Sequence, residues 1–158
     1  MRFPLSVAVA SIIQDNKILL INRVSGSYTG KWALPGGKIE QQEHLSQAII
    51  REIKEEAGIK STFKNFLGVV SEHLVENNQI IQHFLLNVCS LEAQDMNIVE
   101  GNEGKLNWFD LDSIDELREK IIPSDYLIIQ KIIKSQEKNH FECVIEKIGE
   151  EYHLRKFT

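Results

Sequence analysis

One segment constrains this chain more than any other: a helical period that begins near His44 and ends at Gly58. At about 100° per residue, the three glutamates Glu52, Glu55 and Glu56 share an arc of roughly 100°. That arc overlaps one flank of an apolar stripe, which is made of Leu45, Ala48, Ile49, Ile53 and Ala57. The pattern therefore predicts an amphipathic helix whose carboxylates lie at the border of a buried face.

Such a grouping of like charges needs a counter-charge. Glutamates spaced by three and four positions destabilise an isolated helix by a few tenths of a kcal/mol per pair, and partial burial raises that cost. One cation, Arg51, cannot neutralise all three, whereas a divalent cation can. Oxygen ligands without His or Cys among them select a hard ion, so Mg²⁺ is expected, with Mn²⁺ as a possibility. From these residues alone, the alternative remains that the glutamates simply form a solvent-exposed acidic face of the helix.

The glycines before the helix favour a binding site. Pro35-Gly36-Gly37 lets the backbone approach a ligand closely, and the Gly37 carbonyl is a candidate further ligand for a cation. Glu43 lies near the start of the helix, where its alternative role is a charge that favours the helix dipole.

The spacing of these residues resembles the Nudix box. Gly37, five residues, Glu43, seven residues and then the run from Arg51 to Ile59 fill every specified position of that signature. The stretch from Trp32 to Gly37 is similar to the family's lead-in, and Trp108-Phe109 resembles an aromatic pair that follows its variable loop. Gln42 and His44 depart from residues common in the family, which affects the loop shape and not the ligand set.

The resemblance implies an α/β fold, a Nudix-like α/β/α sandwich with a mixed sheet, over about residues 3–137. It also implies hydrolysis of a nucleoside diphosphate linked to a group X, with a carboxylate taking the proton of the attacking water. The implied metal ligands are Gly37, Glu52, Glu55 and Glu56, with Arg51 orienting a carboxylate and Glu43 assisting. For the general base, Glu52 comes first and Glu103 second, with Glu100 close behind; a solvated acidic loop is the alternative for the last two.

The substrate is less well defined. Between Gly58 and Leu91 the chain has neither the Pro nor the Tyr that marks some Nudix subgroups, and Leu19 to Gly37 does not match the coenzyme A pattern. By elimination it resembles the branch that cleaves nucleoside triphosphates, oxidised purine nucleotides included. The alternatives are an ADP-ribose or other nucleotide-sugar pyrophosphatase, or a non-catalytic nucleotide sensor on the same fold.

Side chains outside the box are candidates for substrate contact. Arg23 and Lys38 are candidate phosphate contacts, with ordinary surface cations as the alternative. Tyr28, Phe84 and Trp32 could stack on a base, although core packing is the default for the last two.

Length and composition narrow the class of protein. A chain of 158 residues with 42% hydrophobic and 26% charged residues indicates one soluble domain spanning 1–158. A net charge of -5 argues against a nucleic-acid partner, and no apolar stretch reaches the roughly 18 residues of a membrane span. Cys89 and Cys143 are interpreted as small core residues in a reducing compartment. We therefore expect a cytoplasmic enzyme with a small-molecule nucleotide as its partner.

Three hairpins and two further helices complete the prediction. The first hairpin is expected over about 5–24, the second over 66–75 and 80–91, and the third over 141–148 and 152–157. The two helices are expected over 113–120 and 124–134, the second with Ser124 as its N-cap. The sheet should carry helices on both faces. The last hairpin, about 141–157, lies outside the usual Nudix domain; it could extend the sheet, cap the core or supply the edge of a homodimer.

Overall fold

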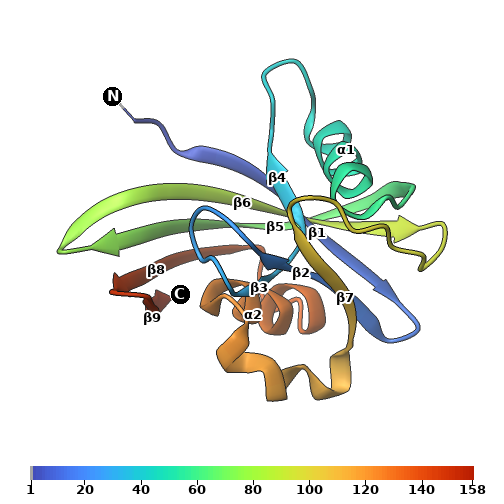
Figure 1. Cartoon of the computed structure of the whole chain (residues 1–158). Helices are drawn as coiled ribbons and strands as arrows, with labels where there is room; N and C mark the ends of the chain where they lie inside the picture. The colour runs from blue at the N-terminus through green and yellow to red at the C-terminus, as the bar shows by residue number, and fades with distance from the viewer. Residues whose placement is uncertain (1) are drawn as a thin grey trace.

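A two-residue turn defines the start of the fold. Asp15 and Asn16 both have positive φ angles, 52° and 60°, which Asp and Asn tolerate and which match the twist of a tight hairpin. The turn joins β1 (Leu5–Gln14) to β2 (Lys17–Arg23), as predicted. The computed structural model describes residues 2–158, and Figure 1 shows their arrangement.

The second hairpin uses the same type of turn and is longer than predicted. Asn77 and Asn78 have φ angles of 52° and 61°, and they join β5 (Ser61–Glu76) to β6 (Gln79–Ala93). Two register shifts between Phe63 and Gly68 interrupt the pairing of these strands. They break the alternation of apolar and polar residues, which is why the first part of β5 does not stand out in the sequence.

The strands form one mixed sheet over the described residues, in the order β3-β2-β1-β6-β5-β8-β9. Strand β1 pairs with β6 in parallel, and β5 pairs with β8 in parallel. Strand β4 pairs with β1 and β7 pairs with β2, both antiparallel. The remaining strands are β3 (Trp32–Ala33), β4 (Gly36–Lys38), β7 (Gly104–Asp110), β8 (His140–Ile148) and β9 (Glu151–Phe157).

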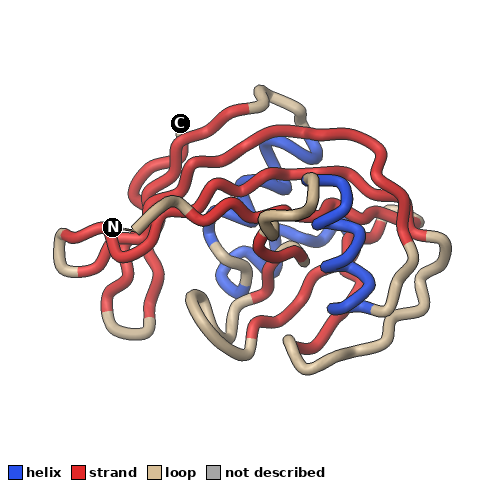
Figure 2. The backbone as a smooth tube through the Cα atoms, turned by 90° about the horizontal axis from the view of Figure 1, so that it is seen from above, coloured by secondary structure: helices blue, strands red, loops and turns tan. Residues whose placement is uncertain are grey.

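Helix α1 (Leu45–Ala57) lies on one side of the sheet and α2 (Pro123–Ile128) on the other, which confirms the α/β/α arrangement (Figures 1 and 2). The helix begins where the His44 amide donates to Gln47 Oε1 at 2.7 Å, and it ends at Gly58, whose φ of 66° is left-handed. Ile49 and Ile53 are fully buried against the sheet. Glu52 and Glu56 are buried beside them, at the border that the helical projection predicted.

The second helical region differs in detail from the prediction. It consists of a 3₁₀ helix η1 (Leu111–Lys120), α2 (Pro123–Ile128) and a π-helical continuation η2 (Ile129–Lys134). The prediction of Ser124 as N-cap is wrong, because the N-cap is Ile122 and Pro123 occupies the first turn. Proline suits that place because its fixed φ is already helical and it lacks an N–H. Ser124 is instead completely buried.

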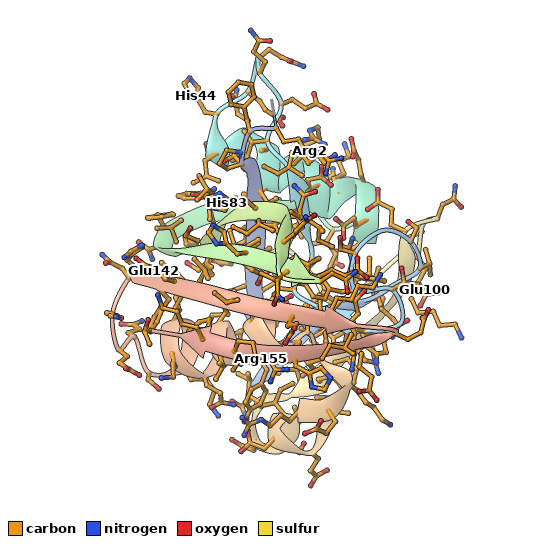
Figure 3. All side chains as sticks on the ribbon, turned by 90° about the vertical axis from the view of Figure 1, so that its left-hand side faces the viewer. Arg2, His44, His83, Glu100, Glu142 and Arg155 are labelled. Atoms are coloured by element: carbon orange, nitrogen blue, oxygen red, sulfur yellow. The ribbon has the colours of Figure 1, made fainter. Side chains whose placement is uncertain are left out.

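The C-terminal hairpin extends the sheet. Strand β8 runs parallel to β5, with Phe141 opposite Val70 and Cys143 opposite Glu72. Figure 3 labels Glu142 on β8 and Arg155 on β9, the two neighbouring strands of this hairpin. Its role as a dimer edge stays a prediction.

Two further findings bear on the class of protein. Cys89 and Cys143 are free and buried, which confirms their interpretation as core residues. Among residues 2–158 we find no helix that is both long and apolar enough to cross a membrane.

Candidate active site

Two glycines bring the sheet and α1 into contact. Strand β4 pairs with β1, and a Cβ on Gly36 would overlap the carbonyl oxygen of Ala8. A Cβ on Gly37 would overlap the carboxylate of Glu52. The Gly36 amide donates to Glu56 Oε1 at 3.3 Å. The lack of side chains at both positions therefore lets two carboxylates of α1 lie directly against the β4 backbone.

Arg51 organises the carboxylates on the outer side of this contact. Its guanidinium donates to both oxygens of Glu43, at 2.9 Å from Nε and 2.6 Å from Nη2. Nη1 donates to Glu52 Oε1 at 2.8 Å and to Glu55 Oε2 at 3.2 Å. The hydrogen bonds from Arg51 hold the pKa of Glu43 down at about 2. Arg51 thus fixes the orientation of Glu52 and keeps Glu43 ionised.

Three carboxylates converge at the end of this network. Glu52, Glu56 and Glu103 each offer an oxygen, and these oxygens lie within 4.8 Å of one another. Glu56 is only 2% exposed, whereas Glu103 reaches in from the exposed loop before β7. We call these three residues the carboxylate cluster.

The charges of the cluster need a cation. Burial, together with the neighbouring charges of Glu103 and Glu52, raises the pKa of Glu56 to about 9. Burial also raises the pKa of Glu52, against the opposing effect of Arg51. A hard divalent cation held by Glu52 and Glu56 beside Glu103 would relieve this repulsion, and the donor set contains only the oxygen ligands that Mg²⁺ and Mn²⁺ prefer. The residues therefore fit such an ion.

Two other predicted residues lie apart from the cluster. Glu55 is exposed and bonds to Arg51, outside the group of converging oxygens. Glu100 accepts a hydrogen bond from the Leu106 amide at 3.2 Å, so it shapes the loop before β7. Their predicted roles as ligand and as base remain untested predictions.

A cavity of about 230 Å³ borders the same glycines. Gly36, Gly37, Lys38 and Arg23 line it, so both candidate phosphate contacts are among its lining residues. Arg23 Nε also donates to the Ser27 carbonyl at 2.8 Å, which holds the loop that follows β2. Burial raises the pKa of both Glu56 and Asp125, and the charge of Arg23 opposes that rise at each of them.

Sequence reasoning missed the buried polar side chains of this cavity. Glu72, Asp125 and Ser124 line it and are buried. For Glu72 a signal was present, since it lies between Val70 and Leu74 at an inward position of a strand, where a charged residue is unusual. Of the three aromatic candidates, Tyr28 and Phe84 line the cavity, whereas Trp32 packs edge-on against Phe109 with ring centres 4.8 Å apart.

Comparison with known proteins agrees with this geometry. Residues 2–132 match the NUDIX domain family. An ADP-ribose pyrophosphatase of Methanocaldococcus jannaschii is 40% identical over 129 residues, which cover 77% of this chain and 73% of that protein. The uncharacterized Nudix hydrolase YvcI of Bacillus subtilis is 30% identical over 127 residues, with 80% and 77% covered.

Solved structures show the same fold. A MutT protein from Bacillus halodurans superposes with a TM-score of 0.76 and 22% identity, over 98% of this chain and 96% of that one. The chain belongs to the Nudix family and is a Nudix pyrophosphohydrolase.

Proposed function

We propose that the chain uses Mg²⁺ to hydrolyse a phosphoanhydride bond in a nucleoside diphosphate derivative, with the base in the cavity and the diphosphate at the carboxylate cluster. The observation that carries this proposal is that Gly36 and Gly37 border both the cavity and the carboxylate cluster. Gly36 and Gly37 line the cavity on one side and contact Glu56 and Glu52 on the other. A nucleotide with its base in the cavity therefore has its phosphates within reach of the cluster.

Different residues of the site bind the cation, accept the proton and contact the phosphates. Glu52 and Glu56 hold the cation, and Arg51 and the Gly36 amide fix one oxygen of each. The cation supplies neutralisation of the charge on the phosphate oxygens. Glu103 takes the proton of the attacking water at its carboxylate, because it is exposed at the mouth of the cluster whereas Glu52 is held by Arg51. Arg23 and Lys38 contact the phosphates from the cavity side.

Within this class we place ADP-ribose first, cleaved to AMP and ribose 5-phosphate. The likeness to the Methanocaldococcus jannaschii enzyme extends over 129 residues. The case for nucleoside triphosphates, cleaved to the monophosphate and pyrophosphate, rests on the absence of a Pro and a Tyr after the box. Sequence similarity over 129 residues is stronger support than the absence of two marker residues, so nucleoside triphosphates are the second candidate.

A product assay tests the proposal. Purified chain is incubated with ADP-ribose, nucleoside triphosphates, dinucleoside polyphosphates and NADH, with and without Mg²⁺. We expect Mg²⁺-dependent cleavage, and a loss of at least about 100-fold in Glu56→Gln, since even outer-shell changes cost 10- to 100-fold. Glu116→Gln, an exposed site on η1, is the matched control. Equal rates for wild type and Glu56→Gln across all substrates would refute the proposal.

A further inference from the structure

A second acidic group lines the cavity, apart from the carboxylate cluster. It consists of Glu72, Asp125 and Tyr28, which are 1%, 7% and 5% exposed, and we call it the acidic pocket. Neither carboxylate forms an ion pair within residues 2–158. Burial raises the pKa of both, and that of Asp125 reaches about 7. Two buried acids without a paired cation have to be explained.

Each carboxylate uses one oxygen within the protein. Glu72 Oε2 accepts from the Tyr28 hydroxyl at 2.8 Å, and Asp125 Oδ2 accepts from the Leu34 amide at 2.9 Å. Glu72 Oε1 is buried and has no hydrogen-bond partner among the described residues. Burial raises the pKa of Glu72, and the neighbouring Ser124, Tyr28 and Cys143 side chains oppose that rise. The Ser124 hydroxyl has no hydrogen bond of acceptable geometry among the described residues. Glu72, which lines the cavity, therefore holds a buried acceptor oxygen without a hydrogen-bond partner among the described residues.

The rest of the cavity is mostly apolar. Its other walls include Val7, Leu34, Phe84, Leu86 and Ile122. Apolar walls with a few placed polar groups at one end are typical of sites that bind the faces of an aromatic ligand and read its edge. The group read by a carboxylate oxygen must be a hydrogen-bond donor.

We propose that the acidic pocket selects bases that carry an exocyclic amino group, adenine or cytosine over hypoxanthine or uracil, with Glu72 Oε1 accepting the amino hydrogen. The proposal rests on the proposed function, because it takes the cavity as the site of the base. The selection requires Glu72 in its ionised form: an oxo base would then place a carbonyl oxygen against the carboxylate, and two acceptors would face each other. Adenine differs from hypoxanthine in this group, and cytosine differs from uracil in the same way.

The C-terminal hairpin positions the Glu72 carboxylate through Tyr28. Tyr28 has a φ of 62°, an unusual value for a bulky residue, and its amide donates to the Tyr152 hydroxyl on β9 at 3.0 Å. The two tyrosine rings lie 4.6 Å apart, and Cys143 on β8 is opposite Glu72. Tyr152 is therefore a positioning residue that acts on Glu72 through Tyr28. It lies outside residues 2–132, the part of the chain that matches the family.

Matched nucleotide pairs test the selection. Binding of AMP and IMP, and of CMP and UMP, is measured by calorimetry on the full chain without metal, and kcat/KM is measured for ADP-ribose and its hypoxanthine counterpart. We expect the amino base to be favoured by about 10- to 100-fold in each pair. In Glu72→Gln the ratio should fall toward one, because an amide offers both a donor and an acceptor. Glu116→Gln should keep the wild-type ratio.

The outcomes separate this inference from the proposed function. Equal binding of AMP and IMP by wild type, no measurable binding of any of the four, or an unchanged ratio in Glu72→Gln would overturn the inference. Amino selectivity in binding without hydrolysis of any substrate would refute the proposed function alone. Should Glu72→Gln not fold, Tyr28→Phe removes the donor to Glu72 Oε2 and is expected to lower the same ratio; a ratio kept at the wild-type value in that variant overturns the inference.

Discussion

The carboxylate cluster and the acidic pocket lie on either side of Gly36 and Gly37, and they hold negative charge in different ways. In the cluster, Arg51 donates to Glu52, and Glu103 keeps one side exposed to solvent. In the acidic pocket, the partners of Glu72 and Asp125 are a hydroxyl and an amide. Similar side chains thus face two different chemical environments.

The difference shows what each site can bind. Oxygens that converge from three carboxylates, one of them exposed, suit a divalent cation that exchanges with solvent. Fully buried acids whose partners are neutral donors suit a neutral ligand that brings one more N–H. The number of acidic residues alone would not have distinguished a metal site from a base-reading site.

Replacing Arg51 should have the largest effect, because it should impair catalysis at the carboxylate cluster and leave base selection by the acidic pocket unchanged. In Arg51→Lys the bidentate contact with Glu43 and the bond to Glu52 cannot both be kept, because an ammonium group lacks the planar fork. We expect kcat/KM to fall by about 10- to 100-fold while the AMP-to-IMP binding ratio is unchanged. Steady-state kinetics and calorimetry would measure the two effects, with Arg155→Lys on β9 as the control. A change in the ratio without a loss of rate would contradict the separation.

Adding a methyl group at Gly37 should act on the cluster from the cavity side. The Cβ of Gly37→Ala would displace the Glu52 carboxylate. We expect the Mg²⁺ concentration for half-maximal activity to rise about 10-fold, because an oriented ligand is lost. Gly101→Ala, where a Cβ meets only ordinary contacts, is the control. An unchanged Mg²⁺ requirement in a folded Gly37→Ala protein would mean that the position of Glu52 does not matter.

The pH dependence of stability should distinguish the sites. The folded pKa values of Glu56 and Asp125 are about 9 and about 7, far above their values in an unfolded chain. The folded protein therefore binds more protons than the unfolded one above about pH 4, and its free energy of unfolding falls as pH rises from 5 to 9.

Urea titrations at pH 5, 7 and 9 without metal would measure this fall. Glu56→Gln and Asp125→Asn should each remove about 1 kcal/mol or more of it. Mg²⁺ should restore stability at pH 9 in Asp125→Asn but much less in Glu56→Gln. A free energy of unfolding that rises with pH in the metal-free wild type would show that these acids are not held as the structure has them.

The smallest effect is expected in Tyr152→Phe. The substitution removes the hydroxyl that accepts from the Tyr28 amide and keeps the ring contact. One such hydrogen bond contributes about 1 kcal/mol, so the AMP-to-IMP ratio should fall by roughly threefold to tenfold. Because Tyr152 contacts no catalytic group, KM for ADP-ribose should rise while kcat stays constant. A fall in kcat with an unchanged KM would place the effect elsewhere.

The sequence contained most of the fold and one of the two sites. Both asparagine-containing turns were visible because positive φ favours few residue types. The cluster was visible because Glu52 and Glu56 lie on one helix, where spacing alone determines which side chains share a face. Ser124 was misassigned because a serine in front of a helix usually caps it, and here Pro123 already occupies the first turn.

The acidic pocket was not visible for a physical reason. Tyr28, Glu72 and Asp125 come from a loop, a strand and a helix, and only the packing of β5, α2 and the hairpin brings them together. No local period connects residues that far apart in the chain. A single inward-facing Glu72 signals that a partner is needed but does not say which one.

The parallel pairing of β5 with β8 also has a consequence for folding order. On the ribosome, residues 61–76 emerge long before residues 140–148, and the strands between them can pair while the last segment is still being made. Tyr28 cannot reach its partner on β9 until the final residues have been synthesised. The residues of the carboxylate cluster, which all precede position 104, are therefore synthesised before the hairpin residues that contact the acidic pocket. A chain stopped short of β8 would have a complete set of cluster residues and an unfinished pocket.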